Sequence, residues 1–256
     1  MRAKQQLQRV LISDLRPTQI TVGAIEVAAK RRDWAGMKPK AREQLLNTHW
    51  FPTVVGPHGE CYIVDHHHLG QALIQEGVKY AWAVQLADFS NMEVQLFWRL
   101  MAFRHWAHSF DEHGAQCEYT AIPGRLAALR DDPYRSLAGE VRSHGGFSKE
   151  SEPYVEFLWA DFFRSHFSRD ALKPNAKGLL SAKVLAQAIK IAHGSTAQNL
   201  PGWTGLLDAA LPVSASLCTD DKDDLSHGAA KGGAKDKLKD KSKPQSKSRP
   251  QSKSKD

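Results

Sequence analysis

Cysteine and long apolar runs are scarce in this 256-residue sequence. Its three cysteines, Cys61, Cys117 and Cys218, are odd in number, and their spacing fits no metal-binding motif. This pattern predicts free thiols in a reducing compartment and argues against a disulfide framework. No stretch approaches the roughly 20 apolar residues of a membrane helix, and residues 1–15 lack the apolar run of a signal peptide. We therefore expect a cytoplasmic protein with no membrane partner.

Most of the chain also lacks a net charge, although the whole sequence carries +7. Residues 229–256 contain ten lysines and arginines and three aspartates, which accounts for all of that excess. The remaining residues are neutral, which argues against a DNA-binding surface on the folded part. The repeated KPQSKS and RPQSKS segments predict a disordered Lys/Ser-rich tail over residues 214–256. This tail could make a weak, salt-sensitive contact with nucleic acid.

Strand and helix signals alternate over residues 7–104 and predict a small mixed α/β domain. Two short apolar runs around a Pro/Gly turn predict a β-hairpin, and Ser90 with Glu93 predicts a capping box. The expected elements are a strand at Val10–Ile12, a helix at Lys40–Thr48, hairpin strands at Pro52–Val55 and Cys61–Val64, a helix from Leu69 to Gly77, a strand at Ala81–Ala87 and a helix ending near Met101.

Helical signals dominate after residue 105 and predict a helical extension over residues 105–213, packed on the first domain. Arg104–Tyr119 is polar and aromatic and is expected to be a loop. Prolines near the start of several segments favour helix initiation. The expected helices are Pro123–Arg130, Pro133–Ser143, Pro153–Phe167 and Ser181–Ala192.

The densest chemistry lies in YIVDHHHLGQAL, residues 62–73, where Asp65 and His66–His68 stand between a strand and a helix. A helix N-terminus presents unpaired N–H groups and attracts phosphate or carboxylate. Asp65 could instead cap the helix. The histidines could add charge, act as acids or bases, or bind metal. Consecutive histidines diverge and no second ligand cluster is obvious, so we expect no metal site.

Several other unusual segments occur in a characteristic order, and with the Asp-His-His-His turn they resemble the ParB-like nuclease family. They are Arg16–Gly23, Pro52–Gly59, Phe97–Met101, Asp131–Lys149 and Glu156–Arg164. The resemblance covers about Val10 to Phe167. It implies the ParB/sulfiredoxin fold, in which this turn holds nucleotide phosphates.

Three positions depart from related branches of that fold. His67 stands where sulfiredoxins have a catalytic cysteine, so sulfinic-acid reduction is not expected. Leu69 stands where partitioning proteins and free-serine kinases have an arginine that grips phosphate. Gln19 lies near the place of the kinase base, and Glu26 follows a few residues later; on its own, Glu26 is interpreted as a solvated charge. No helix-turn-helix reader follows the domain.

A basic cluster in DDPYRSLAGEVRSHGGFSK could supply the missing phosphate contact. Arg135 and Arg142 are seven residues apart and so share a helical face, and Lys149 follows a Gly-Gly hinge. Ion pairing is an equally good interpretation, with partners among Asp131, Asp132, Glu140, Glu156 and Asp161. His105, His108 and His113 could form a second imidazole group, but a polar loop is the favoured interpretation.

We therefore expect either a nuclease or a nucleotide-dependent phosphotransferase. The candidate catalytic residues are Asp65, His67, His68 and Glu26, and the candidate phosphate-binding residues are His66, Arg135, Arg142 and Lys149. The cofactor is not defined by the sequence, although a nucleotide with Mg²⁺ is compatible. A non-catalytic nucleotide-binding or DNA-associated module is the alternative. A contribution of His68 to binding should grow below about pH 6.5, where an unperturbed imidazole is charged.

Overall fold

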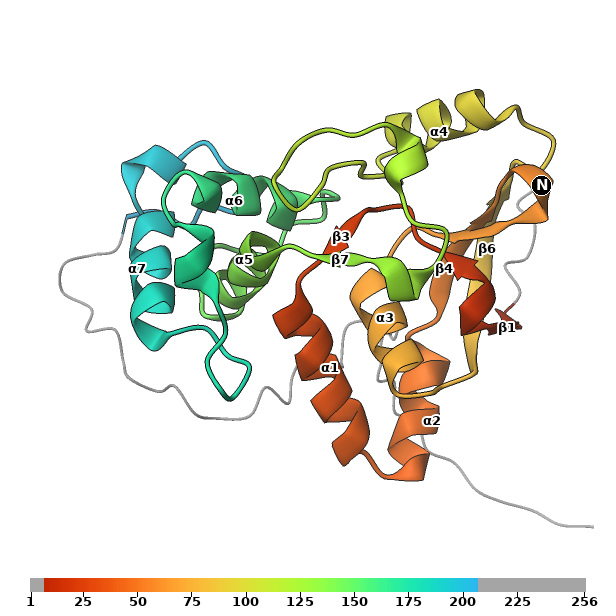
Figure 1. Ribbon diagram of the computed structural model, residues 1–256, viewed down its shortest axis with the longest axis horizontal. Helices are drawn as coiled ribbons and strands as arrows, with labels where there is room; N and C mark the ends of the chain where they lie inside the picture. Colours follow the sequence, from red (N-terminus) through yellow and green to blue (C-terminus); the bar gives the residue numbers. More distant parts are fainter. Residues whose placement is uncertain (1–6, 207–256) are drawn as a thin grey trace, which may run out of the picture. The chain divides into compact units, whose positions relative to one another are not determined.

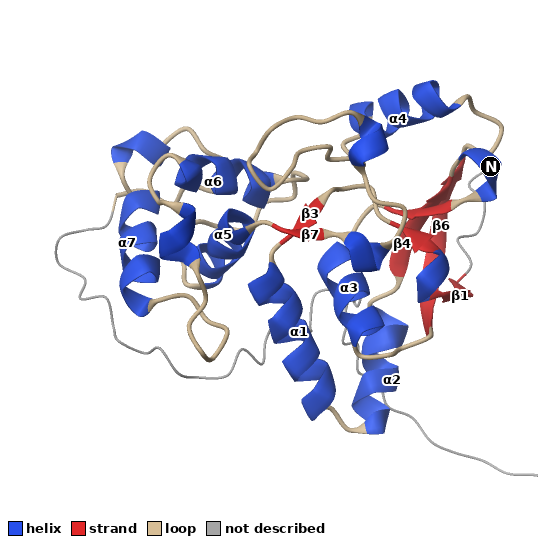
Figure 2. Cartoon of the chain, viewed as in Figure 1, coloured by secondary structure: helices blue, strands red, loops and turns tan. Residues whose placement is uncertain are grey.

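A computed structural model describes residues 7–206 of the chain. Its main feature is a mixed five-stranded sheet in the order β1-β6-β4-β5-β2 (Figure 2). Only β6 with β4 and β5 with β2 pair in parallel. The strands are β1 (Leu7–Leu11), β2 (Leu15–Arg16), β4 (Phe51–Val55), β5 (Cys61–Ile63) and β6 (Tyr80–Asp88). The mixed α/β prediction is confirmed, and the predicted tail lies outside the described residues.

Helices of the N-terminal half pack beside this sheet, and α1 lies against α3 (Figure 1). The helices are α1 (Ala24–Gly36), α2 (Pro39–Thr48), α3 (His67–Gln75) and α4 (Val94–Phe103). Phe51 and Ile63 of the sheet are fully buried against Leu73 of α3 and Trp34 of α1. This core fixes α3, and therefore the Asp-His-His-His turn, against the end of β5.

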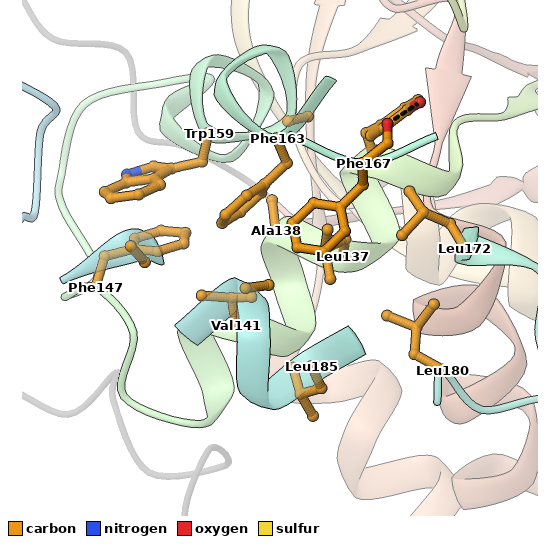
Figure 3. Close-up of a cluster of buried hydrophobic side chains, with 14 of the residues drawn as sticks. Leu137, Ala138, Val141, Phe147, Trp159, Phe163, Phe167, Leu172, Leu180 and Leu185 are labelled. Carbon is orange, nitrogen blue, oxygen red and sulfur yellow. Dashed lines mark hydrogen bonds between the residues drawn. The ribbon is translucent and has the colours of Figure 1, made fainter. Parts of the chain in front are cut away.

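A second core is formed by α5 (Pro133–Ser143), α6 (Val155–Arg164) and α7 (Ala182–Ala192). Trp159 is fully buried and stacks on Phe147 with ring centroids 4.3 Å apart (Figure 3). Ile25 of α1 packs into this second core, whereas Trp34 of the same helix packs into the first. The helix α1 is therefore shared by both cores. The predicted boundary at residues 104 and 105 stays a prediction.

A short parallel pair, β3 (Thr21–Val22) with β7 (Arg130–Asp131), joins the segment before α1 to the segment before α5. The predicted helix Pro123–Arg130 is wrong, because only a 3₁₀ turn forms there, at Leu126–Ala128. The chain then extends because the Arg130 N–H donates to the Ile20 carbonyl at 3.1 Å.

Two other local features differ from what the sequence predicted. The first is the helix α1, for which the sequence predicted no element. The capping box at Ser90 and Glu93 is also wrong, since Glu93 is itself the N-cap of α4 and its carboxylate accepts from the Leu96 N–H at 3.1 Å. A glutamate side chain thus takes the role that the sequence assigned to serine. Across residues 7–206, no helix is both long enough and apolar enough to span a membrane.

Candidate phosphate site at the start of two helices

The N-terminus of α1 is held by side chains from three distant segments. The N–H groups of Gly23, Ala24 and Ile25 donate to acceptors on His68, Asp131 and Ser136, respectively. The distances are 3.0 Å to His68 Nε2, 2.8 Å to Asp131 Oδ1 and 3.2 Å to Ser136 Oγ. These bonds satisfy donors that a helix N-terminus otherwise leaves unpaired. They also bring α1, α3 and α5 together around the next residue, Glu26.

Gly23 permits this close approach. A Cβ atom there would lie 2.8 Å from Ser136 Oγ and 2.9 Å from the Ser136 backbone nitrogen. We expect Gly23→Ala to lower the free energy of unfolding by about 1–3 kcal/mol, the usual cost of overpacking. Denaturant unfolding measures it. Gly36→Ala is the matched control, because a Cβ at this last residue of α1 meets no atom within 4 Å. Equal effects of the two substitutions would contradict the packing described for Gly23.

Glu26 lies at the centre of the converging helices. Its Oε2 atom is 3.4 Å from both His68 Nε2 and Arg135 Nη1, and its Oε1 atom is 3.6 Å from Lys30 Nζ. Burial raises the pKa of this carboxyl, but the charge that His68 carries below about pH 4, together with those of Arg135 and Lys30, outweighs burial and lowers the pKa to about 2. Glu26 is therefore ionised at neutral pH. The solvated-charge interpretation is wrong, because its side chain is only 29% exposed and contacts three partners.

His68 is buried and neutral. Burial lowers its pKa to about 4 although the Glu26 carboxylate opposes this shift. Because Nε2 accepts from the Gly23 N–H, we assign the ring proton to Nδ1. The expectation that His68 gains charge below pH 6.5 is corrected accordingly, since the charged form appears only near pH 4.

His67 connects α3 to the segment before β3. Its Nε2 atom accepts from the Thr18 N–H at 3.1 Å, while the Thr18 hydroxyl donates to the Ile63 carbonyl at 2.9 Å. Burial lowers the pKa of His67 well below its ordinary value. Its Nε2 lone pair is engaged, which leaves this atom unable to accept a proton from a substrate without breaking the contact.

Asp65 and His66 form the entrance to α3. His66 is the N-cap in a left-handed conformation (φ 64°), and its N–H donates to Asp65 Oδ1 at 2.6 Å. No side chain caps α3, so Asp65 does not serve as the helix cap. Burial lowers the pKa of His66, and the nearby charges of Lys30 and Lys149 lower it further. Lys149 is therefore close enough to this turn to act on it electrostatically.

The arginines of α5 are ion-paired and face the same centre. Glu156 of α6 pairs with Arg142 Nη1 and lies 3.8 Å from Arg135 Nη2. Arg135 also contacts Glu26, and its guanidinium lies 5.4 Å from the centre of the Phe157 ring. Its side chain is only 9% exposed, yet its Nε atom has no hydrogen-bond partner within residues 7–206. Arg135 and Arg142 are therefore both ion-paired, and the Nε–H donor of Arg135 has no partner among the described residues.

Two further residues belong to this region: Tyr154, which the sequence did not single out, and His108, for which a polar loop was the favoured interpretation. His108 stacks on Tyr154 and lies 4.1 Å, centroid to centroid, from Phe157. Burial and the Arg135 charge lower the pKa of His108 to about 4. Burial and, to a smaller extent, the Asp65 carboxylate raise the pKa of the Tyr154 hydroxyl. Tyr154 lies in no recognisable motif, and only its aromatic neighbours along the chain could have drawn attention to it.

The site thus brings most of the predicted residues together. His68, Glu26 and Arg135 make direct contacts, and His66 and Lys149 interact electrostatically. Within the described part of the chain, no group of three or more His, Cys, Asp or Glu side chains could hold a metal ion. A cavity of about 280 Å³ lies beside the site between α1 and α3, lined in part by Val27, Gln71 and Leu129, but not by the histidines.

The described residues thus form a mixed α/β fold with an Asp-His-His-His turn at the start of α3. Residues 8–165 match the family model described as "Putative ParB-like nuclease", and the chain belongs to that family. The structure is similar to the crystal structure of protein Atu1540 from Agrobacterium tumefaciens, with a TM-score of 0.72 and 39% identity. That similarity covers 79% of this chain and 100% of that chain. No protein with a curated description matches the sequence.

Proposed function

We propose that the protein is an enzyme that acts on phosphate bonds, with a nucleotide or nucleic-acid phosphate bound between the start of α3 and Arg135. The observation that carries this proposal is the unpartnered, buried Nε of Arg135 beside a helix N-terminus that no side chain caps. An arginine donor and backbone N–H groups at a helix start both bind phosphate oxygens well. Lys30 and Lys149 add positive charge to the same region.

In this proposal Glu26 is the group that accepts a proton from the attacking water or hydroxyl. Its low pKa makes it a weak base while it faces Arg135 and Lys30. A bound phosphate would share the charge of Arg135 and so raise the pKa of Glu26 towards the useful range. His68 would donate a hydrogen bond to the ligand from Nδ1, and His67 would hold the turn in place. Asp65 would orient the ligand indirectly, by fixing His66 through the hydrogen bond from the His66 N–H.

The residues present do not fit a resident magnesium site. The carboxylates of Glu26 and Glu156 are each engaged by cationic side chains. Mg²⁺ usually binds through one or two carboxylates together with substrate phosphates and waters. We therefore assign no step to a protein-bound metal.

A non-catalytic nucleotide-binding module is the second candidate. It is favoured by the lowered pKa values of Glu26 and His68, because both groups are poor bases near pH 7 in this arrangement. A DNA-associated role has less support, because the basic excess of the sequence lies in residues 229–256.

A thermal-shift screen tests phosphate binding, and cleavage assays separate the two candidates. We expect ATP, CTP, GTP or UTP, with or without Mg²⁺, to raise the melting temperature, since a ligand at 100 times its Kd stabilises by about 2.7 kcal/mol. Labelled single-stranded DNA, duplex DNA and RNA are assayed for cleavage, and the nucleotides for hydrolysis or phosphoryl transfer. Binding without turnover would favour the module. No shift with any phosphate compound would overturn both.

A further inference from the structure

Buried polar side-chain atoms that lack a hydrogen-bond partner are rare in folded proteins and call for an explanation. Residues 7–206 contain four: Glu112 Oε2, Arg135 Nε, Tyr154 Oη and Trp203 Nε1. Glu112 Oε2 is accounted for by an ion pair with Arg130 at 2.9 Å. Two of the others, on Arg135 and Tyr154, belong to the phosphate site described above.

The Tyr154 ring is connected to Arg135 through continuous aromatic packing. Tyr154 stacks on His108 with ring centroids 4.8 Å apart, and His108 lies 4.1 Å from Phe157. The guanidinium of Arg135 is over that same Phe157 ring. The Asp65 carboxylate at the entrance to α3 adds to the effect of burial in raising the pKa of the Tyr154 hydroxyl. The rings of His108 and Phe157 therefore link Tyr154 to the Arg135 side of the site.

The backbone at Tyr154 is held in an unfavourable conformation. It is the N-cap of α6 with φ 65°, a left-handed value that non-glycine residues seldom adopt, and it has no side-chain cap. His66, at the start of α3, has φ 64° and is another of the four non-glycine residues with positive φ in residues 7–206. Such strain persists where the surrounding structure fixes a side chain in one position, often at functional sites.

We propose that Tyr154 is a further ligand-binding residue of this site, whose hydroxyl donates a hydrogen bond to an oxygen of the phosphate-bearing ligand. This inference rests on the proposed function. Burial, with a smaller contribution from the Asp65 carboxylate, raises the pKa of the phenol, so the hydroxyl remains a donor. Arg135 Nε and Tyr154 Oη would then contact the ligand from α5 and α6, while the N–H groups of α3 contact it from the opposite element.

Tyr154→Phe tests this proposal because it removes one oxygen and keeps the stacked ring. The hydroxyl has no protein partner to lose, so the melting temperature should stay within about 2 °C of the parent or rise. The Kd of ATP with Mg²⁺, and that of inorganic phosphate, should increase about tenfold or more, the scale of a hydrogen bond to a charged acceptor. Isothermal titration calorimetry gives both constants.

Tyr134→Phe is the matched control. The Tyr134 hydroxyl is also in a buried tyrosine, but it donates to the Phe167 carbonyl at 2.9 Å. Its loss should lower the melting temperature and leave both Kd values unchanged. The proposal is overturned if Tyr154→Phe binds both probes as tightly as the parent, or if its only effect is the lowered melting temperature seen for Tyr134→Phe.

Arg135→Lys separates this inference from the proposed function. If Arg135→Lys weakens binding and Tyr154→Phe does not, the phosphate site stands and the role of Tyr154 is wrong. If the parent binds neither ATP nor inorganic phosphate, the phosphate site and the role of Tyr154 fail together. Weakened binding in both variants, with the melting temperature of Tyr154→Phe unchanged, supports both.

Discussion

Arg135→Met is expected to abolish phosphate binding and to lower the free energy of unfolding by about 3 kcal/mol. Removing one member of a buried ion pair typically costs about 3–5 kcal/mol, because the remaining charge loses its partner. Here Glu26 and Glu156 both lose Arg135, but Lys30 still lies near Glu26 and Arg142 still pairs with Glu156. Because these contacts remain, we expect the loss of unfolding free energy to lie at the low end of that range. Denaturant unfolding and nucleotide calorimetry measure the two effects.

Two companion variants keep this prediction testable if Arg135→Met does not fold. Arg135→Lys preserves a positive charge but lacks the Nε donor and the planar fork, so it should fold and bind phosphate at least tenfold more weakly. Glu26→Gln should fold and bind phosphate as tightly as the parent or more tightly, because Arg135 no longer pairs with a carboxylate, while any turnover is lost. Unchanged nucleotide affinity in Arg135→Lys would argue against a phosphate contact by Arg135.

Local signals explain what the sequence predicted well. The helix α5 was predicted at Pro133–Ser143 and is observed there, because its start depends on neighbouring residues alone. Pro133 occupies the first turn, and the Asp132 carboxylate accepts from the Tyr134 N–H at 3.0 Å. The hairpin of β4 and β5 was predicted for the same reason, since its turn residues lie between the two strands.

The helix α1 was missed because its stabilising contacts are distant in sequence. Its buried residues divide between two cores, with Ile25 in one and Val27 and Trp34 in the other, so they form no single apolar stripe. Its N-terminus is capped by His68 and by side chains more than a hundred residues away. The importance of Glu26 was hidden for the same reason, because its position depends on how α1 starts.

The functional turn was found from the sequence, but its protonation states were not. Three adjacent histidines and an aspartate are conspicuous in any context, whereas burial is a property of the fold. The backbone N–H groups of Thr18 and Gly23 donate hydrogen bonds to the Nε2 atoms of His67 and His68, respectively. In both rings Nε2 is therefore an acceptor. A sequence alone assigns both rings the pKa of a free imidazole, and the packing of α1 and α3 changes that value.

This burial predicts that the folded state is sensitive to mild acid. The pKa values of His68 and His108 are both lowered to about 4, and those of His66 and His67 are also lowered. In the unfolded chain these imidazoles take up protons near pH 6.5, whereas in the folded state His68 and His108 resist uptake until about pH 4, and burial also disfavours the charged forms of His66 and His67. The unfolded state therefore binds more protons between these values, and stability falls as the pH is lowered through this range.

The expected loss of unfolding free energy on acidification is large compared with the stability of a typical domain. For His68 and for His108, the fall of the pKa from about 6.5 to about 4 corresponds to about 3 kcal/mol each, and domains are stable by only about 5–15 kcal/mol. We expect cooperative unfolding with a midpoint between about pH 4 and pH 6. Below about pH 4.5 the protonation of Glu26, whose pKa is lowered to about 2, should destabilise the fold further. Circular dichroism during acid titration measures the midpoint.

His108→Phe isolates one contribution, because phenylalanine can keep the stack on Tyr154 and Phe157 without titrating. The variant should lose about 2–3 kcal/mol less stability than the parent between pH 7 and pH 4, and its acid midpoint should move to lower pH. His58→Asn is the control, since His58 is exposed and asparagine tolerates its left-handed backbone (φ 62°). If His108→Phe and His58→Asn unfold at the same pH as the parent, buried neutral imidazoles are not the cause of the acid sensitivity.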